Sequence, residues 1–203
     1  MSESHKPVEN CLNQPLPPHI LPIIQSIHAK LGKLTIVTIH KHSGFIYQDS
    51  DIKFQDSLVY KHQFFDSIYQ GQVKTEESFL GLFNKVVPHG IGKCYSKDGI
   101  TFFEGQWKNG LLHGYGRAIF DWGGFYQGMW ENGDWHGKGI YENEKGDLYE
   151  GYWAKGAPHG LLKVTRMTES AQEIVGRSDS VEVLSGNWVH GRLNGKGKLW
   201  HNI

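Results

Sequence analysis

A glycine followed two residues later by a large ring recurs along the sequence after residue 80. The glycines are separated by 24, 23, 23 and 35 residues, and they are Gly81, Gly105, Gly128, Gly151 and Gly186. The rings that follow them belong to Phe83, Trp107, Trp130, Trp153 and Trp188. A period between about 20 and 50 residues indicates a repeat architecture, in which each unit packs against its neighbours. We therefore expect five structural repeats.

Other positions keep the same register relative to these glycines. The residues two positions before them are Phe79, Phe103, Tyr126, Tyr149 and Leu184. The residues eight positions after them are His89, His113, His136, His159 and Asn194. A further glycine always follows at the ninth position. Agreement at so many positions excludes a chance alignment.

Each repeat is expected to form one β-hairpin. Glycine costs about 1 kcal/mol relative to alanine inside a helix, so segments this rich in glycine are poor helices. Rings and glycines alternate with polar residues over 103–108, a period of two that is typical of a strand. Asn109-Gly110 and Asn132-Gly133 then favour a tight turn, because both residue types tolerate a positive φ. Lys155-Gly156 and His190-Gly191 occupy the same place in later repeats.

The glycines have a packing role in this interpretation. Rings and glycines share one face of the hairpin over 126–141, where strands of alternating side chains place Tyr126 and Trp130 beside Gly137 and Gly139. Positions without a side chain leave room for large rings. Because an isolated hairpin is marginally stable in water, the rings are expected to pack on the next repeat.

The segment from Tyr126 to Gly139 reads Y-x-G-x-W-x-x-G-x-x-H-G-x-G and resembles the MORN repeat (membrane occupation and recognition nexus). The resemblance departs from the pattern at Val86, Leu162 and Asn194. It implies a mostly β fold, a single-layer twisted antiparallel β-hairpin solenoid, with a mixed N-terminal cap or extension. The five repeats are expected to span 79–203, with an insertion near 165–182.

The N-terminal eighty residues have a different composition. Residues 1–33 are expected to be an extended segment with one short helix, which has Pro22 in its first turn and ends at Gly32. Residues 34–78 are expected to be a strand-rich cap that possibly includes degenerate repeats, with strands at 34–40, 45–48, 58–65 and 67–73. We expect the last of these to pair with 79–83. An independent partner-binding arm is the alternative.

Composition sets limits on the class of protein. The chain holds 21 Lys and Arg against 21 Asp and Glu, so no block is basic enough to indicate nucleic-acid binding. Its 2 cysteines are too few for a disulfide framework, which indicates a reducing compartment. The first residues lack the apolar core of a signal peptide, and no apolar run approaches the length of a membrane span. A cytoplasmic protein is expected.

The recurring histidines invite a metal hypothesis, which hairpin geometry opposes. Equivalent residues of adjacent hairpins lie about 10 Å apart, whereas zinc holds each histidine nitrogen at about 2.0–2.1 Å. We expect each imidazole instead to form a hydrogen bond with turn backbone. The segment 133–139 has the wrong spacing for a phosphate loop, and nothing in the sequence indicates an activated nucleophile. We therefore expect no enzyme activity, no metal and no cofactor.

The leading functional hypothesis is a structural scaffold. A one-layer sheet cannot bury all its rings, so we expect an aromatic groove that binds a helix or extended segment of a partner protein. The groove would consist of Phe83, Trp107, Tyr126, Trp130, Tyr149, Trp153 and Trp188. The alternative that neighbouring repeats bury these rings completely stays open. Similarity to MORN proteins implies a component of the cytoskeleton or of a cilium or flagellum, such as the axoneme or a radial-spoke head.

The second hypothesis is a peripheral membrane adaptor that binds acidic phospholipid. The basic residues twelve positions after the repeat glycines are Lys93, Arg117, Lys163 and Lys198. They would line up on the polar face of the sheet, where each contributes about 1 kcal/mol near an anionic surface. Glu104 and Glu150 recur on the same face, which favours an ordinary solvated surface.

The last strand, over 196–200, has only three residues after it to cover its edge. Uncovered strand edges tend to pair with another chain. We therefore expect Trp200, or the edge that carries it, to be buried in an assembly.

Overall fold

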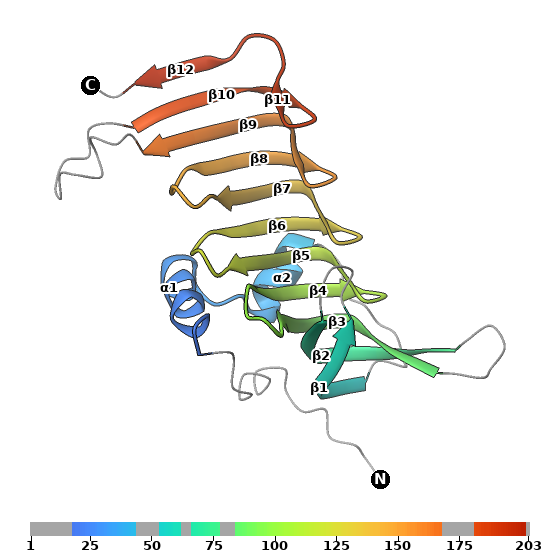
Figure 1. Cartoon of the computed structure of the whole chain (residues 1–203). Helices are drawn as coiled ribbons and strands as arrows, with labels where there is room; N and C mark the ends of the chain where they lie inside the picture. Colours follow the sequence, from blue (N-terminus) through green and yellow to red (C-terminus); the bar gives the residue numbers. More distant parts are fainter. Residues whose placement is uncertain (1–17, 44–52, 62–65, 78–83, 168–180, 202–203) are drawn as a thin grey trace. The chain divides into compact units, whose positions relative to one another are not determined.

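The computed structural model describes residues 18–43, 53–61, 66–77, 84–167 and 181–201 (Figure 1). Contacts divide the chain into two compact units, residues 1–121 and residues 122–203. Antiparallel strands in sequence order make up most of each unit. The predicted mostly β fold of consecutive hairpins is therefore confirmed.

The described residues of the first unit form two helices followed by five strands. The helices are α1 (Leu21–Leu31) and α2 (Ile36–Ser43). The strands are β1 (Lys53–Lys61), β2 (Asp66–Glu77), β3 (Asn84–Ser96), β4 (Thr101–Lys108) and β5 (Leu111–Phe120). Each strand pairs antiparallel with the next one along the chain. The helices therefore add a second layer that the predicted single-layer sheet did not include.

The helix α1 confirms its sequence signals. It carries proline in its first turn and ends before Gly32, which has a φ of 79°. Its apolar side is buried through Ile20, Ile24 and Ile27. Burial of this stripe stabilises a helix of only 11 residues, a length that is marginal alone in water.

The strand predicted at 34–40 is wrong, because the structure has the helix α2 there. β-branched residues favour a strand locally, but tertiary packing overrides such preferences. The hydroxyl of Thr35 accepts a hydrogen bond from the backbone nitrogen of Thr38 at 3.2 Å, which caps the first turn. Ile39 is buried, and α2 lies against β5. The strand predicted at 45–48 lies outside the described residues.

The predicted pairing of 67–73 with 79–83 is wrong. In the structure β2 pairs with β3, and Gly71 faces Gly92 as Gly105 faces Gly116 in the next hairpin. The first described repeat is therefore built on Gly71, which lies within the segment 34–78 where degenerate repeats were considered. The separation of its glycines is 21 residues instead of 11, so the connection is ten residues longer. Gly81 and Phe83 lie in 78–83, outside the described residues.

The described residues of the second unit form seven strands. They are β6 (Phe125–Glu131), β7 (Asp134–Glu142), β8 (Leu148–Ala154), β9 (Ala157–Met167), β10 (Val181–Val189), β11 (Arg192–Leu193) and β12 (Lys198–His201). The strands β6 to β10 pair antiparallel in sequence order, and both β11 and β12 pair with β10. The return strand of the last hairpin is thus interrupted between β11 and β12. Of the predicted insertion near 165–182, residues 168–180 lie outside the described residues.

The tight turns form as predicted. The first residues of the four turns have positive φ values: Asn109 52°, Asn132 52°, Lys155 51° and His190 48°. A glycine with positive φ follows each of them. Two successive positive φ angles match the twist of the flanking strands, as in a type I′ turn. Turn glycines also link hairpins, since the nitrogen of Gly156 donates to the carbonyl oxygen of Trp135 at 3.0 Å.

One face of each sheet, here the ring face, carries the recurring rings. In the first unit the indole nitrogen of Trp107 donates to the carbonyl oxygen of Gly92 at 3.1 Å. In the second unit Trp153 donates in the same way to Gly139 at 3.2 Å. A Cβ atom added at Gly139 would overlap the hydroxyl of Tyr126. The glycines therefore make room for rings of the same or the following hairpin.

Candidate functional site

The opposite side of each sheet, here the ion-pair face, corresponds to the predicted polar face. In the first unit a row of register partners crosses four strands: Gln70, Lys93, Glu104 and Arg117. Direct partners in a sheet point to the same face, so these four side chains lie side by side. All four are buried. The guanidinium of Arg117 donates to Oε1 of Glu104 at 3.0 Å.

The helices of the first unit cover this row. The imidazole Nε2 of His28 on α1 lies 3.0 Å from Oε1 of Glu104. The guanidinium of Arg117 also donates to the carbonyl oxygen of Gly32, at the end of α1, at 3.0 Å. The ring of His42 on α2 stacks on Tyr115 with a centroid distance of 4.3 Å. The segment that contains α1 and α2 (Figure 1) is thus held on the sheet by the contacts of His28 and Gly32 with the Glu104–Arg117 pair and by the stacking of His42 on Tyr115.

The desolvated arginine depends on its carboxylate partner. The side chain of Arg117 is only 1% exposed, against 12% for Glu104. Burial lowers the pKa of the Arg117 guanidinium from its ordinary value, and the negative charge of Glu104 opposes this effect. Arginine stays charged in nearly all protein environments, so a compensating acid must accompany it into the interior. Glu104 provides that charge.

The second unit repeats an acid–base pair at the equivalent position, and among the described residues this pair is exposed. Glu150 and Lys163 are register partners on β8 and β9, and the Lys163 ammonium lies 3.4 Å from Oε2 of Glu150. Their side chains are 39% and 49% exposed. Beside them on the same face, Tyr152 is 52% exposed and Leu161 is 67% exposed. The second unit therefore presents an ion pair flanked by apolar side chains to the surroundings.

The family comparison agrees with this repeat geometry. The model of the MORN repeat matches residues 87–101, 103–125, 126–148, 149–161 and 185–202. The chain belongs to the MORN-repeat family. The first match begins within β3, so the MORN model does not include β2 and its Gly71, which form the other half of that hairpin. A search of curated proteins finds no match.

Most rings of the predicted aromatic groove are buried within the MORN sheet. Trp107, Tyr126, Trp130 and Trp153 are buried, and Tyr149 and Trp188 are half-buried. In the second unit Tyr126 stacks on Trp135 at 4.3 Å and meets Trp153 edge to face at 5.6 Å. Packing within the sheet thus buries these four rings, so they do not line an open groove. Phe83 lies outside the described residues.

The predicted basic column of the MORN sheet divides into two parts. Lys93 and Arg117 are buried in the first unit, where the helices cover the face. Lys163 and Lys198 are exposed in the second unit. Within each unit the two basic residues share one face of the strands, and sequence reasoning missed the helical cover of the first unit. Phe102, Tyr115 and Ile119 gave a signal for it, because they place apolar side chains on the face expected to be polar.

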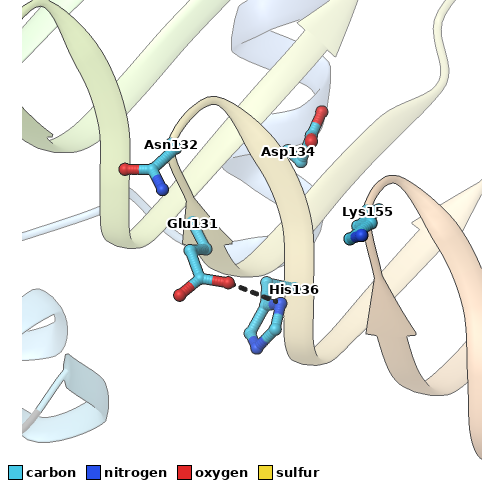
Figure 2. A pocket seen from close by; sticks show the side chains of 5 residues that line it. All are labelled: Glu131, Asn132, Asp134, His136 and Lys155. Atoms are coloured by element: carbon cyan, nitrogen blue, oxygen red, sulfur yellow. Dashed lines mark ion pairs between the residues drawn. The ribbon is translucent and has the colours of Figure 1, made fainter.

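The repeating histidines have different partners from one MORN repeat to another. The ring nitrogen Nδ1 of His89 accepts from the backbone of Asn109 in the next turn at 3.4 Å, as expected for turn backbone. His136 instead pairs through Nδ1 with Oε2 of Glu131 at 3.2 Å (Figure 2). These two residues line a shallow pocket at the hairpin ends together with Asn132, Asp134 and Lys155.

Within the part of the chain that the structure covers, no group of three His, Cys, Asp or Glu side chains could hold a metal ion. Neither α1 nor α2, the helices of the described ranges, has the length and apolar character needed to cross a membrane.

Proposed function

We propose that this MORN-repeat protein is a non-catalytic scaffold that holds a segment of a partner protein on its sheet, within a cytoskeletal or ciliary assembly. MORN repeats place the chain among repeat proteins of the scaffold and interaction class. The observation that carries the proposal is the helix α1, which lies on the ion-pair face through contacts with Glu104 and Arg117. A sheet that holds a helix of its own chain has the chemistry to hold one from another chain.

The ion-pair face supports this function better than the ring face does. Binding through Trp107 or Trp130 would require a partner to separate rings that already pack between hairpins. Binding over Glu150 and Lys163 requires no such change, because their side chains are accessible. Most protein interfaces form with little movement of the backbone, which favours the accessible surface.

Extraction of the native protein from its cells tests the scaffold proposal. Cells are treated first with non-ionic detergent and then with high salt, and each fraction is blotted beside a lipid-anchored and a cytoskeletal marker. We expect the protein to stay in the pellet with the cytoskeletal marker after both steps. Release by detergent, together with the lipid-anchored marker, would contradict the proposal. Staining of intact cells then distinguishes a cilium from the rest of the cytoskeleton.

Binding of acidic phospholipid is a second candidate, favoured by the exposure of Lys138, Lys163 and Lys198 on one unit. Each basic residue near an anionic surface contributes about 1 kcal/mol, so three would give a weak, salt-sensitive attraction. Burial of Lys93 and Arg117 removes the other half of the predicted column. Sedimentation with vesicles that contain phosphatidylserine tests this candidate, and Lys163→Glu should release the protein if the lysines carry the binding.

A further inference from the structure

Two ion pairs of the chain occupy equivalent positions in different MORN repeats. Glu150 follows Glu104 by 46 residues, and Lys163 follows Arg117 by the same 46 residues, which is twice the 23-residue period. Each pair consists of direct register partners on adjacent strands of one hairpin. The two sites therefore share a backbone frame, the order of charges and the face of the sheet.

The first of these sites shows which chemistry the frame accepts. The helix α1 and the glycine that ends it bring two polar contacts to this site, and the apolar side of the helix is buried. Apolar side chains of Ile24 and Ile27 are buried, the imidazole of His28 lies against Glu104, and the carbonyl oxygen of Gly32 accepts from Arg117. The imidazole and the carbonyl are four residues apart, so one helical turn spans the acid and the base of the pair.

The second site has matching groups that are exposed. Tyr152 and Leu161 flank the Glu150–Lys163 pair and are 52% and 67% exposed. Soluble proteins seldom leave large apolar side chains together at the surface unless they serve an interaction. Lys138 adds a further positive charge as the register partner of Tyr152. At the first site the counterpart of Leu161 is Tyr115, which is buried and stacks on His42 of the helix α2.

We propose that the surface formed by Glu150, Tyr152, Leu161 and Lys163 docks an amphipathic helix of a partner, with the same chemistry as α1. The inference rests on the proposed scaffold function and names the class of partner for it. The helix places its apolar stripe on Tyr152 and Leu161 and directs an imidazole or a cation at Glu150. One turn later its last carbonyl groups meet Lys163.

Charge complementarity sets the direction of this helix. The C-terminus of a helix carries a partial negative charge and unsatisfied carbonyl oxygens, which a lysine ammonium can neutralise and bind. Glu150 repels a carboxylate and attracts a cation in the preceding turn. A helix in the opposite direction would place its positive N-terminus against Lys163, which is unfavourable. The site therefore selects one orientation as well as one kind of side chain.

A peptide of residues 18–33 of this chain, which contains α1, serves as the probe. The full-length protein is labelled with 15N, and its amide resonances are followed during a titration to about 2 mM, since a free helix this short is marginal in water. We expect shifts in β8 and β9 around Glu150, Leu161 and Lys163. A peptide with His28→Glu should bind at least fivefold more weakly, because it brings a second carboxylate to Glu150.

Two protein variants locate the binding. Leu161→Glu should weaken binding at least tenfold, and its exposure makes a loss of fold unexpected, which circular dichroism checks. Lys145→Glu, in the exposed turn between β7 and β8, changes a charge outside this surface and should bind as the natural sequence does. Equal binding of both variants would overturn the proposal.

Other outcomes also decide the question. Shifts confined to β4 and β5 would mean that the peptide only replaces α1 at its own site, and would overturn a second site. Absence of any shift at the highest concentration would overturn it as well. If the native protein nevertheless remains with the cytoskeletal pellet, the scaffold function stands and only this docking surface is wrong.

Discussion

The two equivalent ion pairs allow a matched test of what burial does to the energy of the same interaction. In the first variant Glu104→Gln replaces the buried carboxylate, and in the second Glu150→Gln replaces the exposed one. Both changes keep the shape of the side chain and remove one charge. The frame, the register and the repeat position are the same, so the difference in stability reports the environment together with the change of base from Arg117 to Lys163.

The distances give the expected size of each effect. At 3.0 Å between Arg117 and Glu104 and an effective dielectric constant of about 20, the attraction is about 5.5 kcal/mol. The glutamine oxygen still accepts a hydrogen bond, and removal of one partner from a buried pair typically costs about 3–5 kcal/mol. We expect a loss of about 3 kcal/mol for Glu104→Gln. For the exposed pair, at 3.4 Å, solvent reduces the loss to about 0.5 kcal/mol or less.

Urea unfolding followed by tryptophan fluorescence measures the global effect. Because the chain has two compact units, a single transition is not assured, and hydrogen exchange of the α1 amides gives the local readout. Glu104→Gln should accelerate exchange in α1, and Glu150→Gln should leave it unchanged. Equal losses of stability in the two variants, or protected α1 amides in Glu104→Gln, would refute the reasoning.

Three further predictions concern single positions. Gly139→Ala should destabilise the protein by about 1–3 kcal/mol in thermal unfolding, since its Cβ meets the Tyr126 hydroxyl, and adding Tyr126→Phe should recover part of this. Burial raises the pKa of Cys94 to about 12, so in a Cys11→Ser variant its thiol should react with a disulfide reagent only after unfolding. As the pH rises, the Cys94 thiol ionises in the unfolded chain, near its ordinary pKa of 9.0, before it ionises in the folded protein. Its contribution to the free energy of unfolding is therefore complete below pH 9.0 and decreases above it. Trp200→Ala should leave unfolding unchanged, because the ring is 50% exposed, but should release the protein from the cytoskeletal pellet.

Hairpins and ring packing could be predicted because their causes are local. Asn-Gly turns require positive φ at both residues, and the structure has those angles at Asn109 and Asn132. Glycines were expected beside rings, and Gly139 lies where a side chain would overlap Tyr126. Both features follow from single residues and the 23-residue period. They would hold in any fold that stacks these hairpins.

The assignment of the first repeat failed because local spacing was ambiguous. Gly81 lies 24 residues before Gly105 and fits the period, whereas the glycine that pairs in the structure is Gly71. A connection of unusual length hides the true partner, because strand pairing depends on register and not on distance along the chain. Only the facing glycine, Gly92, could have indicated the correct alignment, through its equivalence to Gly116.

The helical cover of the first unit could not be derived from charges alone. Glu104 and Arg117 look like an ordinary solvated pair, as do Glu150 and Lys163. The distinguishing signal lies in their neighbours, since β4 and β5 are buried at nearly every position and therefore on both faces. A strand that is buried on both faces has apolar residues at consecutive positions of its sequence. Phe102 and Phe103 in β4 are an example. In the strand β8 only Trp153 is buried, and Tyr152 beside it is exposed on the other face.

The choice of base in the two ion pairs agrees with this difference in cover. Arginine keeps its charge when it is desolvated, and its planar group can contact a carboxylate and a carbonyl oxygen at once, as Arg117 does with Glu104 and Gly32. Lysine loses its charge more readily when buried and retains water more strongly. A helix over Lys163 therefore costs more desolvation than α1 costs over Arg117. The first site suits permanent cover by the chain's own helix, and the second suits a partner that binds and leaves.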